Sequence, residues 1–422
     1  MNKMLLNGLI IISSMLVFQG CSDDESTDPV SPSYNAFDCS TSQSCISEDT
    51  TWSGQVSLES QTYVTNGATL TIEAGTTITA TATDGAGLAT ALIIDRGAKI
   101  MAEGTAELPI TFTSVTGTGS GTWGGLIING NAPISNEGGE AFVEGLVGVP
   151  YGGNDPTDNS GVLRYVRVWH GGSVIGQDNE INGITLAGVG NGTIVDHCEV
   201  AYNKDDGFEM FGGTVDLTNC AVINVGDDAF DTDNGYQGRG QFLFVHRDDA
   251  SDKAHEMDNK TDSNFDSQPR SHPIFSNVTI VGGSVNAVRV REGTGGDFRN
   301  YIIVGGAEGF QNDDNGTELV TQDFSSTSGL YPDYLYISSN NVVYGNGDSG
   351  CFKEFEDSST FSGTCVNSDT GVTVDPLNVI PTSAGAAYEG VDTVESDWFV
   401  QTDYKGAFGT TNWHIGWSIL SQ

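Results

Sequence analysis

Two pairs of neighbouring aspartates are the residues of this sequence best suited to do chemistry. The stretch "DDGFEMFGG" begins with Asp205 and Asp206, and "DDAFDTDNG" begins with Asp227 and Asp228, 22 residues further along the chain. Carboxylates held close together repel one another, so either their pKa values rise or a cation neutralises them. Calcium accepts about six to eight oxygen ligands in irregular arrangements, which makes it the cation that such a cluster suits best.

A shift of 22 residues places acid on acid in the two stretches. Glu209 aligns with Asp231, just as the first aspartate pair aligns with the second. We therefore predict a calcium site assembled from stacked turns, because no EF-hand loop is present. The alternative is a solvated acidic face whose Asp and Asn residues form turns. The predicted metal ligands are Asp205, Asp227, Asp228, Asp231 and Asp233.

The same row of acids is the predicted binding face for a ligand. Further along the chain, "VRVREG" (288–293) supplies two arginines and "QNDDNG" (311–316) supplies another acid pair. The arginines either contact a ligand beside the acids or balance the acidic charge. The predicted binding residues are Asp205, Asp206, Glu209, Arg289, Arg291 and Asp313.

A long segment, "HRDDASDKAHEMDNKTD" (246–262), interrupts the 22-residue spacing. Excursions from a repeat often line the binding face of a repeat protein. We expect this insertion to offer Glu256, Asp258 and Asn259 as further ligands.

The acids must be positioned by the elements around them, and these elements also repeat. "ATLTIEAGTTI" (68–78) aligns with "TALIIDRGAKI" (90–100), and 195–213 aligns with 217–235 at the same shift. Short apolar runs alternate with period two between Gly, Asn and Asp, which is typical of strands joined by turns. The pattern predicts an all-β, right-handed parallel β-helix of about a dozen rungs over 51–345, followed by a C-terminal cap or lateral cover over 346–422.

Equivalent positions in successive rungs should stack. Asn219, Asn277 and Asn300 share one position, with His197, and we expect a structural ladder there. Cys198 and Cys220 share the next, inward position, where adjacent rungs bring Cα atoms within disulfide range. We favour a Cys198–Cys220 bridge, and the alternative is two stacked buried thiols. The other predicted disulfides are Cys39–Cys45 and Cys351–Cys365.

The N-terminal segment indicates export and lipidation. "MNKMLLNGLIIISSMLVFQG" (1–20) has a basic residue followed by a short apolar run, as in a signal peptide, and Cys21 follows. We predict a lipoprotein signal over 1–20, lipidation of Cys21 and a flexible acidic tether over 21–50. The residues "SDDE" after the cysteine resemble the surface-export signal of Bacteroidota lipoproteins, which implies an outer-membrane, cell-surface location.

Charge excludes some partners. The sequence has 56 acidic and 16 basic residues, for a formal charge of −40. Nucleic acid and anionic membrane surfaces are therefore poor electrostatic partners, and we predict no nucleic-acid partner, whereas divalent cations and cationic ligands are favoured. The six histidines have no metal-ligand spacing, and no serine-nucleophile or phosphate-loop motif is present.

Four motifs together resemble a known family. They are "WGGLIINGNAPI" (123–134), "YGGNDPTDNSGVLRYVRV" (151–168), "FDTDNGY" (230–236) and the "GAFG…W" ending. The chain resembles outer-surface β-helix lipoproteins of Bacteroidota and marine Proteobacteria, within the pectate-lyase-like superfamily. This resemblance implies the fold and the location but supplies no mechanism.

Three classes of function follow. The first is non-catalytic binding of a glycan or other ligand, beside an outer-membrane transporter. The second is a calcium-assisted lyase or hydrolase acting on uronate polymers, because "NVGDDAFD" (224–231) resembles the aspartate pair of polygalacturonase-type hydrolases. The partner motifs of that family, Gly-His-Gly and Arg-x-Lys, are absent. The third is a structural or adhesive surface protein. If the protein is an enzyme, the predicted catalytic residues are Asp206, Asp227, Asp228 and Arg291.

Overall fold

The computed structural model describes residues 43–83, 87–143, 146, 148–176, 179–259, 265, 267–313, 335–345, 350–353, 365–382 and 384–422. All of them belong to one compact unit, residues 35–422. The predicted signal peptide and Cys21 lie outside these residues. Within the described part of the chain, no helix is long and apolar enough to span a membrane.

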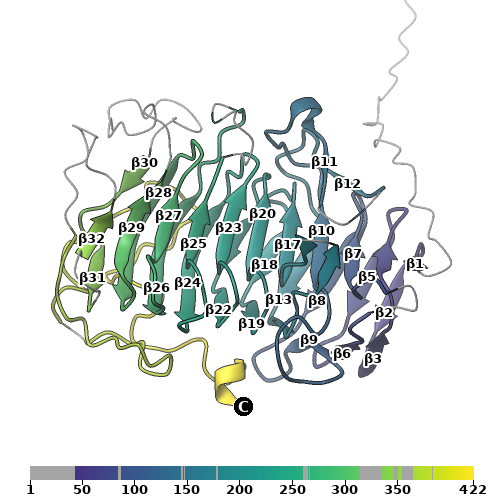
Figure 1. Ribbon diagram of the computed structural model, residues 1–422, viewed down its shortest axis with the longest axis horizontal. Helices are drawn as coiled ribbons and strands as arrows, with labels where there is room; N and C mark the ends of the chain where they lie inside the picture. The colour runs from purple at the N-terminus through teal and green to yellow at the C-terminus, as the bar shows by residue number, and fades with distance from the viewer. Residues whose placement is uncertain are drawn as a thin grey trace, which may run out of the picture. The chain divides into compact units, whose positions relative to one another are not determined.

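The chain forms an all-β parallel β-helix (Figure 1). One face, sheet A, stacks eleven parallel strands, which agrees with the predicted dozen rungs. Its strands, in order, are β1 (Ser44–Ile46), β4 (Thr62–Val64), β7 (Leu92–Ile94), β10 (Leu126–Asn129), β17 (Ile184–Ala187), β20 (Phe208–Phe211), β23 (Phe230–Asp233), β25 (His255–Met257), β27 (Val288–Val290), β29 (Glu308–Asn312) and β32 (Gly350–Lys353).

The second sheet, sheet B, contains two parallel stacks that merge in three long strands, β24 (Arg239–Arg247), β26 (Ile274–Gly282) and β28 (Gly296–Val304). The first stack also contains β2 (Thr50–Trp52), β5 (Thr69–Ile72), β8 (Lys99–Glu103), β13 (Gly161–Arg164), β18 (Ile194–Asp196), β21 (Asp216–Thr218) and β30 (Leu335–Ile337). The second contains β3 (Gln55–Leu58), β6 (Thr77–Ala80), β9 (Ile110–Ser114), β14 (Val166–Trp169), β19 (Glu199–Ala201), β22 (Ala221–Ile223) and β31 (Val342–Tyr344). Two hairpins, β11 (Ala141–Phe142)–β12 (Pro150–Tyr151) and β15 (Val174–Gly176)–β16 (Asn179–Glu180), and two short 3-10 helices, η1 (Glu137–Gly139) and η3 (Ile419–Ser421), complete the elements.

Alternation within each strand separates the core from the outer face. In β20 and β23, Phe208 and Phe230 are fully buried and stack at 5.2 Å between ring centroids, as the 22-residue period predicts. The next residues, Glu209 and Asp231, pair in register and point outward. Along each of these strands, one side chain thus packs into the continuous apolar core and the next points to the surface.

The predicted asparagine ladder lies at a sharp corner of sheet B. Asn219, Asn277 and Asn300 all adopt left-handed backbone conformations, with φ between 52° and 58°. Asparagine tolerates this conformation better than most residues because its side chain bonds locally. The amides of the later rungs bond the C-terminal segment: Asn300 donates to the carbonyl of Asp392 (2.9 Å) and accepts from its amide (2.8 Å).

The C-terminal segment is a lateral cover rather than an end cap. Its apolar residues, including Phe408 and Ala387, form a second core against the outer face of the second stack of sheet B. A buried carboxylate holds its end in place. Glu199 accepts hydrogen bonds from Trp169 Nε1 (2.7 Å) and the Ile419 amide (3.0 Å), and pairs with His414 Nε2 (2.6 Å).

Three predicted boundaries differ from the structure. Strand β1 and the start of β2 lie inside the segment predicted to be a tether, so the β-helix begins earlier, at Ser44. Strand β32 lies inside the predicted cap and pairs with β29, so it extends sheet A. The interruption at 246–262 contains β25, which is an ordinary rung of sheet A. In each case the strand is only three or four residues long and departs from the 22-residue period.

The predicted Cys198–Cys220 disulfide is wrong, because both thiols are free and fully buried. Cys198 and Cys220 occupy equivalent positions in the bends between β18 and β19 and between β21 and β22. Side chains at equivalent positions of stacked rungs point in the same direction, about 4.8 Å apart, so their Cβ atoms do not converge as a disulfide requires. The Cys351–Cys365 bridge is present, with the Cα atoms 5.6 Å apart. Cys45 is disulfide-bonded, and its predicted partner Cys39 lies outside the described residues.

The carboxylate of Glu199 is central to the attachment of the C-terminal cover, and the variant Glu199→Gln tests its contribution. Burial alone would raise the pKa of Glu199, but the hydrogen bond and charge of His414 keep that pKa below its usual value. Removing the charge should lower the free energy of unfolding by on the order of 2 kcal/mol. Calorimetry would measure this loss, and limited proteolysis would show earlier cleavage near the C-terminus.

The control for this experiment is Glu395→Gln, an exposed glutamate in the same C-terminal segment. This variant should melt and resist protease like the wild type. Equal melting temperatures for Glu199→Gln and the wild type would contradict the role assigned to the buried carboxylate.

Candidate functional site

An acidic groove lies on the outer face of sheet A over β20, β23 and β25. The segment that contains η1, β11 and β12 stands beside it and covers the same face over β7, β10 and β17 (Figure 1). The groove has a volume of about 490 Å³. Its lining residues are Asn136, Ala141, Phe142, Val143, Tyr151, Ile181, Asn182, Thr185, Asp205, Asp206, Glu209, Phe211, Asp227, Asp228, Asp231, Asp233, Asn234, Glu256, Asp258 and Arg291.

Strand register brings the acids together. Along one outward column of sheet A, Thr185 pairs with Glu209, Glu209 with Asp231, and Asp231 with Glu256. Three carboxylates therefore follow one another at the spacing of adjacent strands, about 4.8 Å. The aspartate pairs lie in the turns that lead into the same strands, so they extend the acidic surface towards the strand starts.

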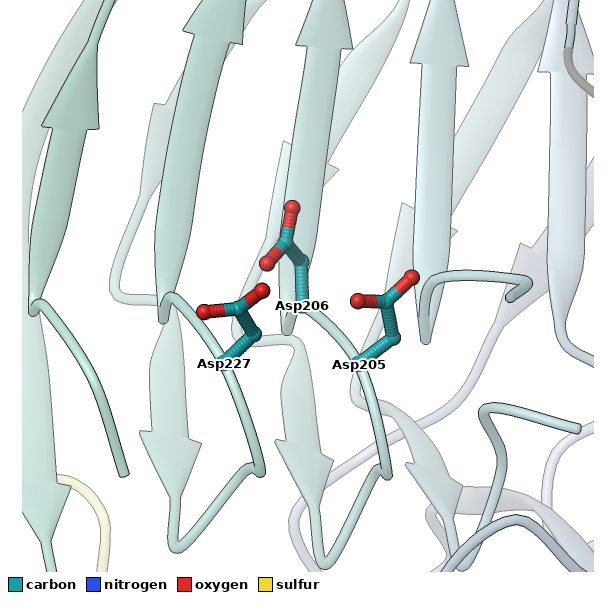
Figure 2. A group of neighbouring side chains, drawn as sticks. All are labelled: Asp205, Asp206 and Asp227. Carbon is teal, nitrogen blue, oxygen red and sulfur yellow. The ribbon is translucent and has the colours of Figure 1, made fainter. Parts of the chain in front are cut away.

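Three overlapping groups of acids have oxygen atoms close enough to share a cation. The groups are Asp205–Asp206–Asp227, Asp206–Glu209–Asp231 and Asp227–Asp228–Asp252, each with the contributing oxygens within 4.8 Å of one another. Figure 2 shows the first group, with the three side chains next to one another where adjacent turns enter sheet A. Because two aspartates belong to two groups each, the groups form one continuous site.

Burial and mutual repulsion raise the pKa values of these acids. For Asp206, burial is the main cause, followed by the charges of Glu209 and Asp228. For Asp231, burial comes first, followed by Asp206 and Glu209. Both pKa values lie well above the usual range for aspartate. Burial and mutual repulsion thus disfavour the charged form of these carboxyl groups, whereas a bound cation would favour it.

Arg291 is the only basic residue among the described residues that line the groove, and it is already engaged. Its Nε donates to both carboxylate oxygens of Asp258 at 2.8 Å, and its Nη2 lies 2.5 Å from Glu256 Oε2. Burial would lower the pKa of Arg291, but the bonds to Asp258 outweigh it and raise that pKa above the ordinary arginine value. Burial raises the pKa of Asp258 to about 7 despite the arginine.

Neutral polar and aromatic side chains complete the groove. The Thr185 hydroxyl and the Asn182 Oδ1 atom are buried and have no hydrogen-bond partner in the described part of the protein. Phe211 packs beside Tyr151 with 6.0 Å between ring centroids, and Phe142 is 57% exposed at the rim. Such groups suit sugar hydroxyls and ring C–H groups, and a metal ion alone requires neither.

The structure brings most of the predicted site residues together. The acids of both repeated stretches, with Arg291, line the one groove. The other two predicted binding residues lie apart from the lining: Arg289 bridges Glu256 (2.9 Å to Oε1) and Asp313. The predicted ligands Glu256 and Asp258 do line the groove, but Asn259 instead bonds backbone groups of 265–271 and supports the turn.

Sequence reasoning missed the neutral part of the groove. Thr185 was detectable in principle, because it lies one strand before Glu209 in register, but the spacing is 24 rather than 22. Tyr151 and Phe142 come from the β11–β12 hairpin, whose position over sheet A depends on tertiary packing. No periodic signal marks such a segment.

Fold and site together define a parallel β-helix protein with an acidic groove on one sheet. Comparison with family models matches residues 44–368 to the family described as pectate-lyase like beta helix domain, and the chain belongs to that family. Comparisons with curated proteins and with solved structures each gave no match.

The repulsion within the groove predicts that Asp231→Asn stabilises the protein in metal-free buffer. The folded pKa of Asp231 lies above its unfolded value, so the wild type loses stability as pH rises from about 3.8. The asparagine variant lacks this loss. Its melting temperature should exceed that of the wild type by an amount that grows as the pH rises above about 4, reaching a few degrees.

Differential scanning fluorimetry across pH measures this difference, with Asp397→Asn as the control. Asp397 is exposed in the C-terminal cover, and its variant should follow the wild type at every pH. An Asp231→Asn protein that melts at or below the wild-type temperature near pH 8 would show that the acids do not repel.

Proposed function

We propose that this chain is a non-catalytic binding protein of the cell surface, whose acidic groove holds a glycan or other ligand. The observation that carries the proposal is the convergence of nine acidic side chains, one arginine and three aromatic rings in one groove. The lipid anchor on Cys21, the outer-membrane location and an outer-membrane transporter as partner belong to the same proposal. The N-terminal sequence supports the lipid anchor and the location.

Calcium is the ion proposed for the groove. The first triplet, Asp205–Asp206–Asp227, and the second, Asp206–Glu209–Asp231, each offer three carboxylates, the hard oxygen ligands that calcium prefers. The remaining positions in a coordination shell of about six to eight oxygens would be filled by water or by ligand hydroxyls. Asp228 adds to the third group, and Asp233 lines the groove beside them.

The ion pairs of Arg291 with Glu256 and Asp258 favour a binding function over lyase chemistry. A lyase base must release its proton near neutral pH, and arginine is a poor base even when free. Here two carboxylates hold the guanidinium in its charged form. This arrangement fixes the arginine as a structural cation within the groove.

A hydrolase is the second candidate, and one observation favours it. Glycoside hydrolysis needs one protonated carboxyl group near one carboxylate. Asp206 has a raised pKa, and one of its carboxyl oxygens lies within 4.8 Å of an oxygen of Asp205 and of one of Asp227. The substrate for this candidate, or for the lyase, would be a uronate polymer such as pectin or alginate.

Calcium should stabilise the protein. At a concentration about 100-fold above its dissociation constant, it should raise the melting temperature by roughly 3 °C, and a chelator should reverse the increase. Asp206→Asn, which removes an acid shared by two triplets, should abolish most of this effect, whereas Asp397→Asn should retain it. Identical melting curves with calcium and with chelator would remove the ion from the proposal.

Turnover assays separate binding from catalysis. Incubation with pectin and with alginate should yield neither unsaturated uronate products nor new reducing ends, with or without calcium. Products formed by the wild type but not by Asp206→Asn would show that the protein is an enzyme and would contradict the binding proposal. If neither turnover nor binding is found for any glycan, the structural or adhesive role remains.

A further inference from the structure

A second groove lies at a corner of the β-helix, where the second stack of sheet B turns towards sheet A. It has a volume of about 470 Å³ and crosses several successive rungs. We call it the corner groove, and its lining includes His170, Tyr202, Asn224, Val225, Asp248 and Ala250. No described residue lines both this groove and the acidic groove, so the two are separate candidate sites.

Stacked rungs place His170, Tyr202 and Asn224 in one column at this corner. The His170 amide donates to the Ala201 carbonyl and the Tyr202 amide to the Ile223 carbonyl, each at 2.9 Å. The rings of His170 and Tyr202 are parallel to within 6°, with 5.6 Å between their centroids. All three residues of the column have left-handed backbones, with φ of 67°, 54° and 50°. Asparagine adopts this conformation more readily than tyrosine, so the Tyr202 ring is held here at a cost in backbone energy, as is common at ligand sites.

The loop between β9 and β10 forms one wall of the corner groove through Thr118, Gly119 and Ser120. Hydrogen bonds fix this wall to the column. The His170 carbonyl accepts from the amide of Thr122 (3.0 Å) and from its hydroxyl (2.8 Å), and His170 Nδ1 lies 2.6 Å from the Gly119 carbonyl oxygen. The groove is therefore formed before a ligand arrives, which lowers the cost of binding.

The column offers acceptor atoms that the protein leaves unused. Because a carbonyl oxygen only accepts hydrogen bonds, His170 Nδ1 carries the proton of the neutral ring, and Nε2 remains as an acceptor. His170 is 7% exposed, and its Nε2 has no hydrogen-bond partner among the described residues. Within the same part of the chain, the Tyr202 hydroxyl also lacks one, and the Asn224 Oδ1 atom is buried without one. Unpaired polar atoms are unfavourable, so a ligand that donates hydrogen bonds here gains affinity.

The rest of the lining is apolar or carries a single charge. Val225 is 3% exposed and lies beside Ala250 in the lining. Among the described lining residues, Asp248 is the only Asp, Glu, Lys or Arg. Its Oδ1 accepts from the amides of Ala250 (2.8 Å) and Ser251 (3.2 Å), whereas its Oδ2 makes no hydrogen bond with a described residue. The corner groove therefore suits a ligand that is rich in hydrogen-bond donors and has an apolar face, without requiring that it be charged.

We propose that the corner groove is a second ligand site, which binds a short neutral oligosaccharide. Sugar hydroxyl groups donate to His170, Asn224 and Asp248 on different rungs, and the C–H face of a sugar ring lies over Val225 and Ala250. This site is independent of calcium and of the acids in the acidic groove. It goes beyond the binding function proposed above and does not rest on it.

Isothermal titration of the full chain in the presence of a chelator tests this proposal, with cellotetraose, mannotetraose and xylotetraose as separate probes. We expect at least one of them to bind with a Kd below about 1 mM, and Tyr202→Phe and Asn224→Gly each to weaken that binding roughly fivefold. Both variants should fold, because the first loses only a hydroxyl group and glycine readily adopts the left-handed backbone of Asn224. Unchanged melting temperatures check this.

Asp231→Asn, a variant of the acidic groove, is the matched control and should bind the same sugar as tightly as the wild type. Binding that is lost in Asp231→Asn but unchanged in Tyr202→Phe and Asn224→Gly would place the sugar in the acidic groove. That result would overturn the corner site and support the function proposed above. If none of the three sugars binds at about 10 mM, the corner site alone fails, because the calcium effect tests the acidic groove separately.

The variant Asp248→Asn separates a neutral sugar from a cationic ligand. It keeps the Oδ1 acceptor that bonds the Ala250 amide and removes the charge. Sugar binding should weaken by less than about threefold, whereas a cation held by Asp248 would bind roughly tenfold more weakly. Spermidine that binds the wild type more tightly than all three sugars, and loses this binding in Asp248→Asn, would overturn the assignment of a neutral ligand.

Discussion

In-register stacking of parallel rungs is the constraint on which the rest of this structure depends. A side chain on one strand of sheet A lies against the side chain at the same position on the next strand, about 4.8 Å away. For apolar residues such as Phe208 and Phe230, this produces a continuous core. For Glu209, Asp231 and Glu256, the same geometry brings like charges together at the surface. The acidic groove therefore follows from the fold, and a bound cation would relieve the repulsion among its acids.

The period of the sequence predicted the parts of the structure that repeat. A 22-residue shift correctly aligned Phe208 with Phe230 and Glu209 with Asp231, and so it predicted which acids would be neighbours. Strand β25 was missed because the loop before it lengthens the rung, although its residues continue the same column. The hairpin β11–β12 and the C-terminal cover do not repeat, so their positions depend on contacts that periodicity cannot reveal. The hairpin supplies Phe142 and Tyr151 of the groove, and the C-terminal cover supplies His414, which pairs with the buried Glu199 of β19.

Equivalent positions in neighbouring rungs bring side chains close together, but they do not determine which groups those side chains bond. Cys198 and Cys220 occupy equivalent positions, as expected, yet their parallel side chains remain thiols inside the core. Asn277 and Asn300 also occupy equivalent positions, but their amides bond mainly the C-terminal cover. Both cases show that stacking brings side chains close together, whereas their bonding depends on orientation and on what else packs nearby.

The central claim is that the acids of the groove are neutralised by bound cations. Crystals soaked in a barium or lanthanide salt, which replaces calcium and scatters anomalously, test it most directly. The account predicts anomalous density among Asp205, Asp206 and Asp227, or among Asp206, Glu209 and Asp231. Density confined to other surfaces of the protein, with none in the groove, would contradict it.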